Sequence, residues 1–286
     1  MTSGNEGIKI AFIGGGNMAA ALISGLANTL TAAANIRVID PNPAALETLR
    51  TRFGVDTAAS CAAGLAGFDV IVLAVKPQSM REVAAQLLPQ LAASLAGGGQ
   101  PLILSIAAGI RSVDLSRWLG GYQAIVRCMP NTPALIGLGI TGMVSAGTVS
   151  AEQKQAADAI MNAVGATVWL ADETLIDPVT AVSGSGPAYV FYFIEAMQQA
   201  ALEMGLSSEQ GTQLALATFV GAAQLAAQST EPVALLRERV TSKGGTTHAA
   251  LVSMEQAGVK QAIVDAVKAA AQRGKELGEQ LGTDPV

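Results

Sequence analysis

Three consecutive glycines near the start of the chain could bind a diphosphate. The apolar run 8–13 ends at Gly14, and an alanine-rich helical pattern begins at Asn17. Gly14 suits a tight turn, Gly16 lets a diphosphate approach the backbone, and the small Ala19 lets the helix pack on the strand. The free N–H groups and the positive dipole at the helix start would also attract phosphates. This strand–turn–helix pattern predicts a dinucleotide site, and the alternative is a purely structural turn.

A second group of residues, far along the chain, could bind a small carboxylate. Hydroxyl residues and two glycines gather directly before a predicted helix: Thr241, Ser242, Lys243, Gly244, Gly245, Thr246, Thr247 and His248. Backbone N–H groups and hydroxyls at a helix start would hold a carboxylate, whereas capping alone needs one Ser or Thr. No strand is predicted before this loop, so it is not a P-loop. Lys243 either adds positive charge or points into solvent, and His248, the only histidine, is more often structural than catalytic.

The residues after the second predicted strand bear on the choice of dinucleotide. Asp40 ends the strand 36–40, where an acid usually accepts the ribose hydroxyls of NAD, but it could instead cap the following helix. Asn42 could donate to a ribose 2′-phosphate, and Arg37 or Arg52 could neutralise one. The sequence therefore leaves NADPH and NADH both open.

Other residues follow predicted strands at the edge where parallel sheets bind ligands. Lys76 follows the buried run 69–75 and would contact a cofactor ribose or phosphate, or else be solvated. Ala107 and Ala108 follow the next buried strand and would line a nicotinamide site or form a tight turn. Asn131, between two prolines, carries a donor and an acceptor that suit a carboxamide or a substrate, or it initiates a turn without a ligand.

The elements that position these residues alternate between strands and helices up to about residue 170. Strand patterns cover 8–13, 36–40, 54–56, 69–75, 101–106, 124–128, 140–146 and 167–170, with a helix at 151–164. Beyond this point only helices are predicted, at about 187–204, 208–227, 232–240 and 247–281. Continuous apolar strands are typical of a parallel sheet buried on both faces. The sequence predicts an α/β chain, with a Rossmann-type sheet in residues 1–170 and an all-helical domain in residues 171–286.

A segment rich in glycine and serine, 183–188, precedes the first of these later helices. It could form an anion-binding loop. Alternatively, it only caps the helix and lets backbones pack closely.

Composition bounds the class of protein. The chain has 286 residues, of which 50% are apolar and 4% aromatic, with a mean hydropathy of +0.41 and a net charge of −5. There is no basic stripe for nucleic acid, no charge-free apolar window of about 18 residues for a membrane span, and no signal-peptide pattern. Cys61, Cys128 and His248 are too few and too scattered for a zinc site, so no metal is expected. We expect a cytoplasmic protein that buries apolar surface against a copy of itself.

Taken together, these motifs resemble those of pyrroline-5-carboxylate reductases, the enzymes of the last step of proline synthesis. The matching blocks follow the family's order over nearly the whole chain: Phe12–Met18, Ala74–Pro77, Met129–Pro133, and Ser183–Ala188 with Val240–Thr247. Many dehydrogenases share the first block, whereas the last three together are specific. The resemblance implies a Rossmann domain followed by a helical dimerisation domain. It also implies hydride transfer from NADPH or NADH to the C=N carbon of 1-pyrroline-5-carboxylate, which gives L-proline.

The resemblance and the patterns above together predict the site residues. Cofactor contacts are expected from Ile13, Gly14, Gly15, Gly16, Asn17, Met18, Asn42, Val75, Lys76, Pro77, Ala107, Ala108 and Asn131. Substrate contacts are expected from Glu173, Gly245, Thr246 and Thr247, and catalytic contacts from Thr180, Ser242 and Thr247. Thr180 would lie near the ring nitrogen, and Ser242 or Thr247 would orient the carboxylate. Two positions depart from the family: Lys243 stands where many members have proline, and Asp40 stands where hydroxyl or amide residues often favour NADPH.

The expected chemistry needs neither a strong base nor a metal. A protonated imine accepts hydride readily, so catalysis depends mostly on placing the nicotinamide C4 about 3–3.5 Å from the imine carbon. One alternative is an oxidoreductase like the β-hydroxyacid dehydrogenases, in which Lys243 would be the acid or base. A second alternative is a non-catalytic scaffold that binds a nucleotide without turnover.

Overall fold

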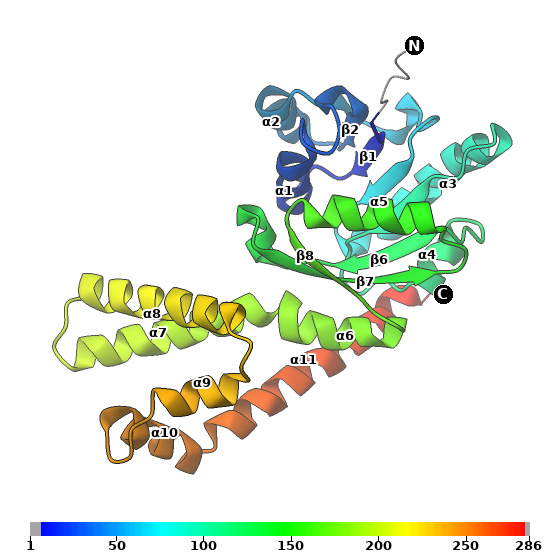
Figure 1. Cartoon of the computed structure of the whole chain (residues 1–286). Coiled ribbons are helices and arrows are strands. Elements are labelled where there is room, and N and C mark those ends of the chain that lie inside the picture. The colour runs from blue at the N-terminus through cyan, green and yellow to red at the C-terminus, as the bar shows by residue number, and fades with distance from the viewer. Residues whose placement is uncertain (1–6, 284–286) are drawn as a thin grey trace. The chain divides into compact units, whose positions relative to one another are not determined.

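The computed structural model describes residues 7–283, which form two compact units (Figure 1). The first unit contains the residues up to Gly184 and those from Ala270 onward, and the second contains Ser185–Ala269. Helix α11 (Val259–Gly282) contributes to both units. The compact units therefore do not follow the division expected after residue 170, and the extent of the functional domains stays a prediction.

The first unit is built on one sheet of eight strands. The strand order is β3-β2-β1-β4-β5-β6-β7-β8, and all neighbours are parallel except β6 and β7. The strands are β1 (Ile10–Ile13), β2 (Ile36–Ile39), β3 (Asp56–Ala58), β4 (Val70–Leu73), β5 (Leu102–Ser105), β6 (Ile125–Met129), β7 (Gly139–Ala146) and β8 (Gly165–Trp169). The order 3-2-1-4-5 is that of dinucleotide-binding sheets. The predicted α/β class and the extension of the sheet by the last two strands are confirmed.

The third strand lies later in the chain than the sequence pattern predicts. Gly54 ends the preceding helix in the left-handed region, with φ of +72°, and its N–H donates to the carbonyl of Arg50. The strand therefore begins only at Asp56 rather than at residue 54.

Helices cover both faces of this sheet (Figure 1). They are α1 (Asn17–Leu26), α2 (Pro43–Phe53), α3 (Met80–Ala96), α4 (Ser112–Trp118), α5 (Ala151–Asn162) and α6 (Ile176–Val179). Short turns of 3₁₀ helix are η1 (Ala33–Asn35), η2 (Cys61–Ala63), η3 (Pro77–Ser79), η4 (Thr132–Ile136) and η5 (Glu173–Leu175), and η6 (Thr180–Gly184) is a π-helical turn. Ile10 and Phe12 of β1 pack with α1, α2 and α5, whereas Ala11 and Ile13 pack with α3 and α4. Burial on both faces explains why β1 and β4 are continuous apolar runs.

The described part of the second unit is helical throughout, as predicted. It contains α7 (Gly186–Glu203), α8 (Ser208–Gln228), α9 (Val233–Arg239), α10 (Thr246–Gln256) and the first part of α11. Helices α7 and α8 lie side by side (Figure 1). Ser207 begins α8 with a capping box that Gln210 completes. The single helix expected at 247–281 is wrong, because Gly258, with φ of +67°, separates α10 from α11.

Between residues 7 and 283, no helix combines the length and the apolar character needed to cross a membrane. The same residues contain no group of three or more His, Cys, Asp or Glu side chains that could hold a metal ion.

Candidate functional site

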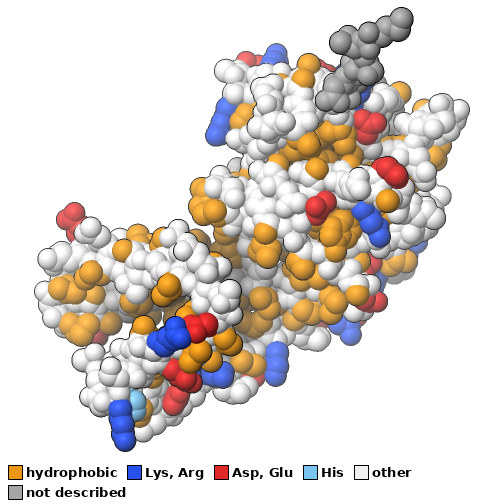
Figure 2. Space-filling view, in the orientation of Figure 1, with side chains coloured by type: hydrophobic (Ala, Val, Ile, Leu, Met, Phe, Trp, Pro, Cys, Tyr) orange, Lys and Arg blue, Asp and Glu red, His pale blue; other side chains and the backbone are white. Residues whose placement is uncertain are grey.

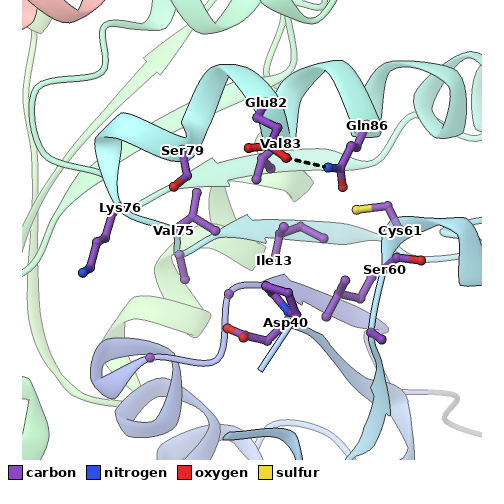
Figure 3. Close-up of a pocket in the computed structure, with 16 residues that line it drawn as sticks. Ile13, Asp40, Ser60, Cys61, Val75, Lys76, Ser79, Glu82, Val83 and Gln86 are labelled. Carbon is purple, nitrogen blue, oxygen red and sulfur yellow. Dashed lines mark hydrogen bonds between the residues drawn. The ribbon is translucent and has the colours of Figure 1, made fainter. Parts of the chain in front are cut away.

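A cavity of ≈ 490 Å³ opens in the first unit where the parallel strands end (Figure 3). It is lined by Ile13, Gly14, Gly16, Ile39, Asp40, Pro41, Ala59, Ser60, Cys61, Ala74, Val75, Lys76, Ser79, Glu82, Val83 and Gln86. Five expected cofactor residues belong to this set, namely Ile13, Gly14, Gly16, Val75 and Lys76. They meet because the carboxyl ends of parallel strands lie at one edge of the sheet, which is where open α/β sheets bind ligands.

The glycine turn leaves room for a diphosphate. Gly14 has φ of +101°, and a Cβ there would lie 2.6 Å from the carbonyl oxygen of Ala74, so only glycine fits. A Cβ on Gly16 would meet nothing within 4 Å. Gly16 is also the N-cap of α1, and because glycine has no side chain, it cannot cap the first N–H groups of this helix. Open space beside unsatisfied N–H groups at a helix start is the arrangement that binds phosphate. These residues therefore fit a dinucleotide.

Asp40 borders the cavity directly after β2. Its Oδ2 accepts a hydrogen bond from the N–H of Gly15 at 2.7 Å, and its Oδ1 accepts one from the N–H of Asn42 at 2.8 Å. The cap of α2 is Asn42, whose Oδ1 accepts from the N–H groups of Ala44 and Ala45. The alternative in which Asp40 caps this helix is therefore wrong. The N–H of Gly15, an expected cofactor contact, is already bonded to Asp40.

Residues on η3 and α3 that sequence reasoning missed line the cavity across from Asp40 (Figure 3). They are Ser79, Glu82, Val83 and Gln86. Gln86 Nε2 donates to Glu82 Oε1 at 3.4 Å. Their spacing of three and four positions places them on one helix face, so helical periodicity after Lys76 is a signal that could have found them.

Ser60 and Cys61 line the cavity beyond the end of β3, and sequence reasoning missed these as well. Cys61 is only 4% exposed, and burial raises the pKa of its thiol above the usual value. The end of the third strand could have indicated these two residues, but the sequence pattern placed that strand too early in the chain.

Several other expected cofactor residues do not line the cavity. Asn17 and Met18 begin α1, and Pro77 begins η3. Asn17 and Pro77 each directly follow a lining residue, whereas Met18 lies one position further along α1. Ala107 is buried in the core on the α3 face, and Ala108 is exposed beyond β5. Their roles in cofactor binding stay predictions.

Asn131 is held by contacts inside the first unit. Its Nδ2 donates to Ser183 Oγ at 3.2 Å, and its Oδ1 accepts from the N–H of Ile140 at 3.0 Å. The side chain therefore joins the loop before η4 to β7 and to η6. These contacts explain why an asparagine occupies this position even in the absence of a ligand. A contact between Asn131 and a cofactor stays a prediction.

The segment 183–188 is largely helical rather than an open loop. The π-helical turn η6 ends at Gly184, and α7 begins at Gly186. A Cβ on Gly184 would lie 2.6 Å from Cε of Met129. The structure thus favours the close-packing alternative over an anion-binding loop.

Thr180 begins η6, and its hydroxyl donates to the carbonyl of Ile176 at 2.8 Å. A threonine oxygen has two lone pairs, which remain able to accept hydrogen bonds. The hydroxyl oxygen of Thr180 can therefore accept a hydrogen bond from a donor group of a ligand.

Glu173 is engaged by the protein itself. Its Oε1 accepts from Nη1 of Arg127 and from the N–H of Ser112, each at 2.8 Å. The side chain of Arg127 is only 5% exposed. Glu173 is therefore the partner of a buried cation, and a substrate contact for it stays a prediction.

The hydroxyl-rich loop in the second unit leads into α10. Gly245 is the N-cap and makes no side-chain cap hydrogen bond, and Gly244 supplies the turn with φ of +77°. Ser242, Thr246 and Thr247 are exposed. The N–H of Gly245 donates to the carbonyl of Ser242 at 3.0 Å. Gly245 thus has no free N–H for a carboxylate, whereas the start of α10 beyond it fits one.

Two sequence models of protein families match the chain. Residues 173–277 match pyrroline-5-carboxylate reductase dimerisation, and residues 9–109 match NADP oxidoreductase, coenzyme F420-dependent. The chain is 47% identical to a pyrroline-5-carboxylate reductase of Pseudomonas aeruginosa, over 96% of this chain and 98% of that protein. The chain belongs to the pyrroline-5-carboxylate reductase family.

Further members of this reductase family agree over both units. One from Haemophilus influenzae is 40% identical, over 94% of this chain and 97% of that protein. A solved pyrroline-5-carboxylate reductase of Coxiella burnetii has a TM-score of 0.87 and 37% identity, and covers 96% of this chain and 99% of its own. A solved Plasmodium falciparum pyrroline carboxylate reductase with NADP bound has a TM-score of 0.83 and 33% identity. The match covers 96% of this chain and 100% of that one. The resemblance drawn from the sequence blocks is confirmed.

Proposed function

We propose that the chain reduces 1-pyrroline-5-carboxylate to L-proline, with NADPH or NADH as the hydride donor. Membership of the reductase family, at 47% identity over 96% of the chain, is the observation that carries this function. The cavity with its glycine turn supports it, because the residues there fit a dinucleotide.

The cofactor is assigned to the cavity of the first unit. The start of α1 beside Gly16 holds the diphosphate, because N–H groups without intrahelical partners lie next to open space. Val75 and Lys76, at the end of β4, contact the ribose and nicotinamide half. When bound, the nicotinamide supplies the hydride.

The substrate carboxylate is assigned to the start of α10. The backbone N–H groups of Thr246 and Thr247 and the hydroxyls of Ser242 and Thr247 bind and orient it. Exposed hydroxyls on a loop shaped by Gly244 support this role. Glu173 is left out of this set, because its carboxylate is bonded to Arg127 and Ser112.

Thr180 is assigned to the ring nitrogen. Its own proton is directed to the carbonyl of Ile176, so its oxygen accepts the N–H of a protonated imine. Such a contact stabilises the cationic form, which is the better hydride acceptor. Most of the remaining barrier falls when the two reacting carbons are held about 3–3.5 Å apart.

The helical domain makes the chain a homo-oligomer, since residues 173–277 match a dimerisation domain. We further propose that this oligomer is a homodimer or a larger assembly, in which contact with another copy covers the apolar face of α7. Phe191 and Tyr192 on that helix are 60% and 73% exposed within the single chain. Light scattering after gel filtration measures the assembly mass. A cytoplasmic location stays a prediction.

A steady-state assay tests the function. NADPH and NADH oxidation is followed with and without added 1-pyrroline-5-carboxylate, and L-proline is measured as the product. The proposal requires oxidation that depends on the imine. Nucleotide binding without turnover would support the scaffold alternative.

A further inference from the structure

The adenosine end of the cavity carries a fixed negative charge. Ile39 ends β2, and it lines the cavity together with Asp40 and Pro41, which follow the strand. Ser60, beyond β3, lines the cavity as well, and Figure 3 shows it with Asp40. In a dinucleotide-binding sheet, the residue at the end of the second strand meets the adenosine ribose. Asp40 is therefore the side chain that meets the 2′ position.

The Asp40 carboxylate is held in place by two backbone donors. The N–H of Gly15 binds Oδ2 at 2.7 Å, and the N–H of Asn42 binds Oδ1 at 2.8 Å. Because each carboxylate oxygen has further acceptor capacity, Asp40 can still accept hydrogen bonds from ribose hydroxyls. Rotating it away from a 2′-phosphate would break both backbone hydrogen bonds.

No arginine lines this cavity among the described residues. Arg37 forms an ion pair with Asp56 at 2.6 Å, and its Nη1 donates to the carbonyl of Gly64. The guanidinium of Arg52 lies 4.9 Å from the ring centre of Phe53. The expectation that Arg37 or Arg52 serves a phosphate finds no support in these contacts.

The remaining charges do not compensate for Asp40. The charged lining residues are Asp40, Glu82 and Lys76. Lys76 follows β4, on the far side of β1 from β2. Asn42 uses its Oδ1 to cap α2, which leaves only its amide nitrogen as a neutral donor. A dianionic 2′-phosphate beside a fixed carboxylate is repelled, whereas a 2′-hydroxyl is bound.

We propose that Asp40 makes this site select a dinucleotide whose adenosine ribose has a free 2′-hydroxyl, so that NADH binds more tightly than NADPH. The inference rests on the proposed function only in placing a nicotinamide dinucleotide in this cavity. It makes Asp40 a specificity-determining residue.

Equilibrium binding to the full-length protein tests the inference without relying on turnover. The dissociation constants of NADH and NADPH are measured by titration calorimetry at low and high salt. Thermal shifts with AMP and with adenosine 2′,5′-bisphosphate isolate the 2′-phosphate. At low salt we expect the dissociation constant of NADPH to exceed that of NADH by about tenfold or more. At high salt the ratio of the two constants should be smaller, because salt screens the repulsion. Equal or tighter binding of NADPH overturns the inference.

Two variants locate the effect. Asp40→Asn removes the charge and keeps the size of the side chain, although its amide nitrogen cannot accept one of the two backbone hydrogen bonds. We expect the ratio to move about tenfold towards NADPH. Glu47→Gln on α2 is the matched control, because it removes an exposed charge that does not line the cavity, and it leaves the ratio within about twofold. An unchanged ratio in a folded Asp40→Asn protein overturns the role of Asp40. If that variant fails to fold, the wild-type ratio still decides the inference.

The outcomes separate this inference from the proposed function. Tighter NADH binding without reduction of the imine contradicts the function and leaves the inference standing. Reduction of the imine together with tighter NADPH binding contradicts the inference alone.

Discussion

The guanidinium of Arg127 donates a hydrogen bond to the carboxylate of Glu173 at 2.8 Å, although the two residues are 46 positions apart. This contact ties η5 to β6, and the N–H of Ser112 adds a second donor from α4. The side chain of Arg127 is 5% exposed, so loss of its partner leaves a buried cation unpaired.

Glu173→Ala is therefore expected to lower the free energy of unfolding by about 1.5–3 kcal/mol, the range for a hydrogen bond to a charged group. Urea unfolding measures this change. The control is Glu47→Ala, whose exposed pair with Arg50 is worth about 0–1 kcal/mol. A Glu173→Ala enzyme with unchanged stability and a raised KM for the imine would instead favour the substrate contact that the family resemblance implies.

The two ends of the glycine turn should respond differently to alanine. Gly14→Ala places a Cβ 2.6 Å from the carbonyl oxygen of Ala74 at φ of +101°, and is expected to cost about 1–3 kcal/mol of stability. The Cβ of Gly16→Ala would meet nothing within 4 Å, so this variant should lose less than about 1 kcal/mol of stability. Its methyl group nevertheless stands where the diphosphate is assigned, so nucleotide affinity should fall. Thermal unfolding and nucleotide titration separate the two effects, and a Gly16→Ala protein with normal affinity would move the diphosphate elsewhere.

Thr247→Ala is expected to raise KM for 1-pyrroline-5-carboxylate by about tenfold, because it removes a hydrogen bond to a carboxylate. Steady-state kinetics at saturating cofactor measure the change. Ser253→Ala removes a hydroxyl from the same helix, away from its start, and should leave KM unaltered. Equal effects of the two variants, or none, would remove Thr247 from the site.

Lys243→Ala distinguishes the reductase from the alternative in which a lysine supplies the acid or base. Lys243 is exposed in the loop before α10, and hydride transfer to a protonated imine needs no such group. Most of kcat should remain in the variant. A loss of about a hundredfold or more would instead indicate general acid–base catalysis by this lysine.

The thiol of Cys61 reports on occupancy of the cavity. Burial raises its pKa above the usual value of a cysteine, so at pH 8 less of it is thiolate, and the thiolate is the form that reacts. Alkylation by iodoacetamide should be slower than for an exposed cysteine and should accelerate only at higher pH. Bound NADH or NADPH should slow it further, because Cys61 lines the cavity. Mass spectrometry of the labelled peptide measures this rate, and labelling unaffected by nucleotide would place the cofactor away from Cys61.

Local patterns predicted the parts of the site that local geometry determines. The turn at Gly14 follows from an apolar run, glycines and a helix start that are contiguous in the chain. The missed lining residues Glu82 and Gln86 depend on the face that α3 turns towards the cavity. Only helical periodicity carried that information.

Contacts between distant segments were not predictable in this way. Nothing near Asn131 indicates that Ser183, 52 positions away, accepts its hydrogen bond. A lone glycine such as Gly258 is tolerated inside helices. Its left-handed conformation, which ends α10, therefore left no clear signal in an alanine-rich stretch. The Glu173 prediction came from resemblance alone, and the structure shows the carboxylate in an ion pair.

The central claim is that this chain transfers a hydride from a reduced nicotinamide to 1-pyrroline-5-carboxylate. The most direct measurement is the stoichiometry of NAD(P)H oxidised and L-proline formed by the purified protein. We predict one L-proline for each nicotinamide oxidised, and no oxidation without the imine. Oxidation that continues without the imine, or binding of the nucleotide with no L-proline formed, would contradict the account.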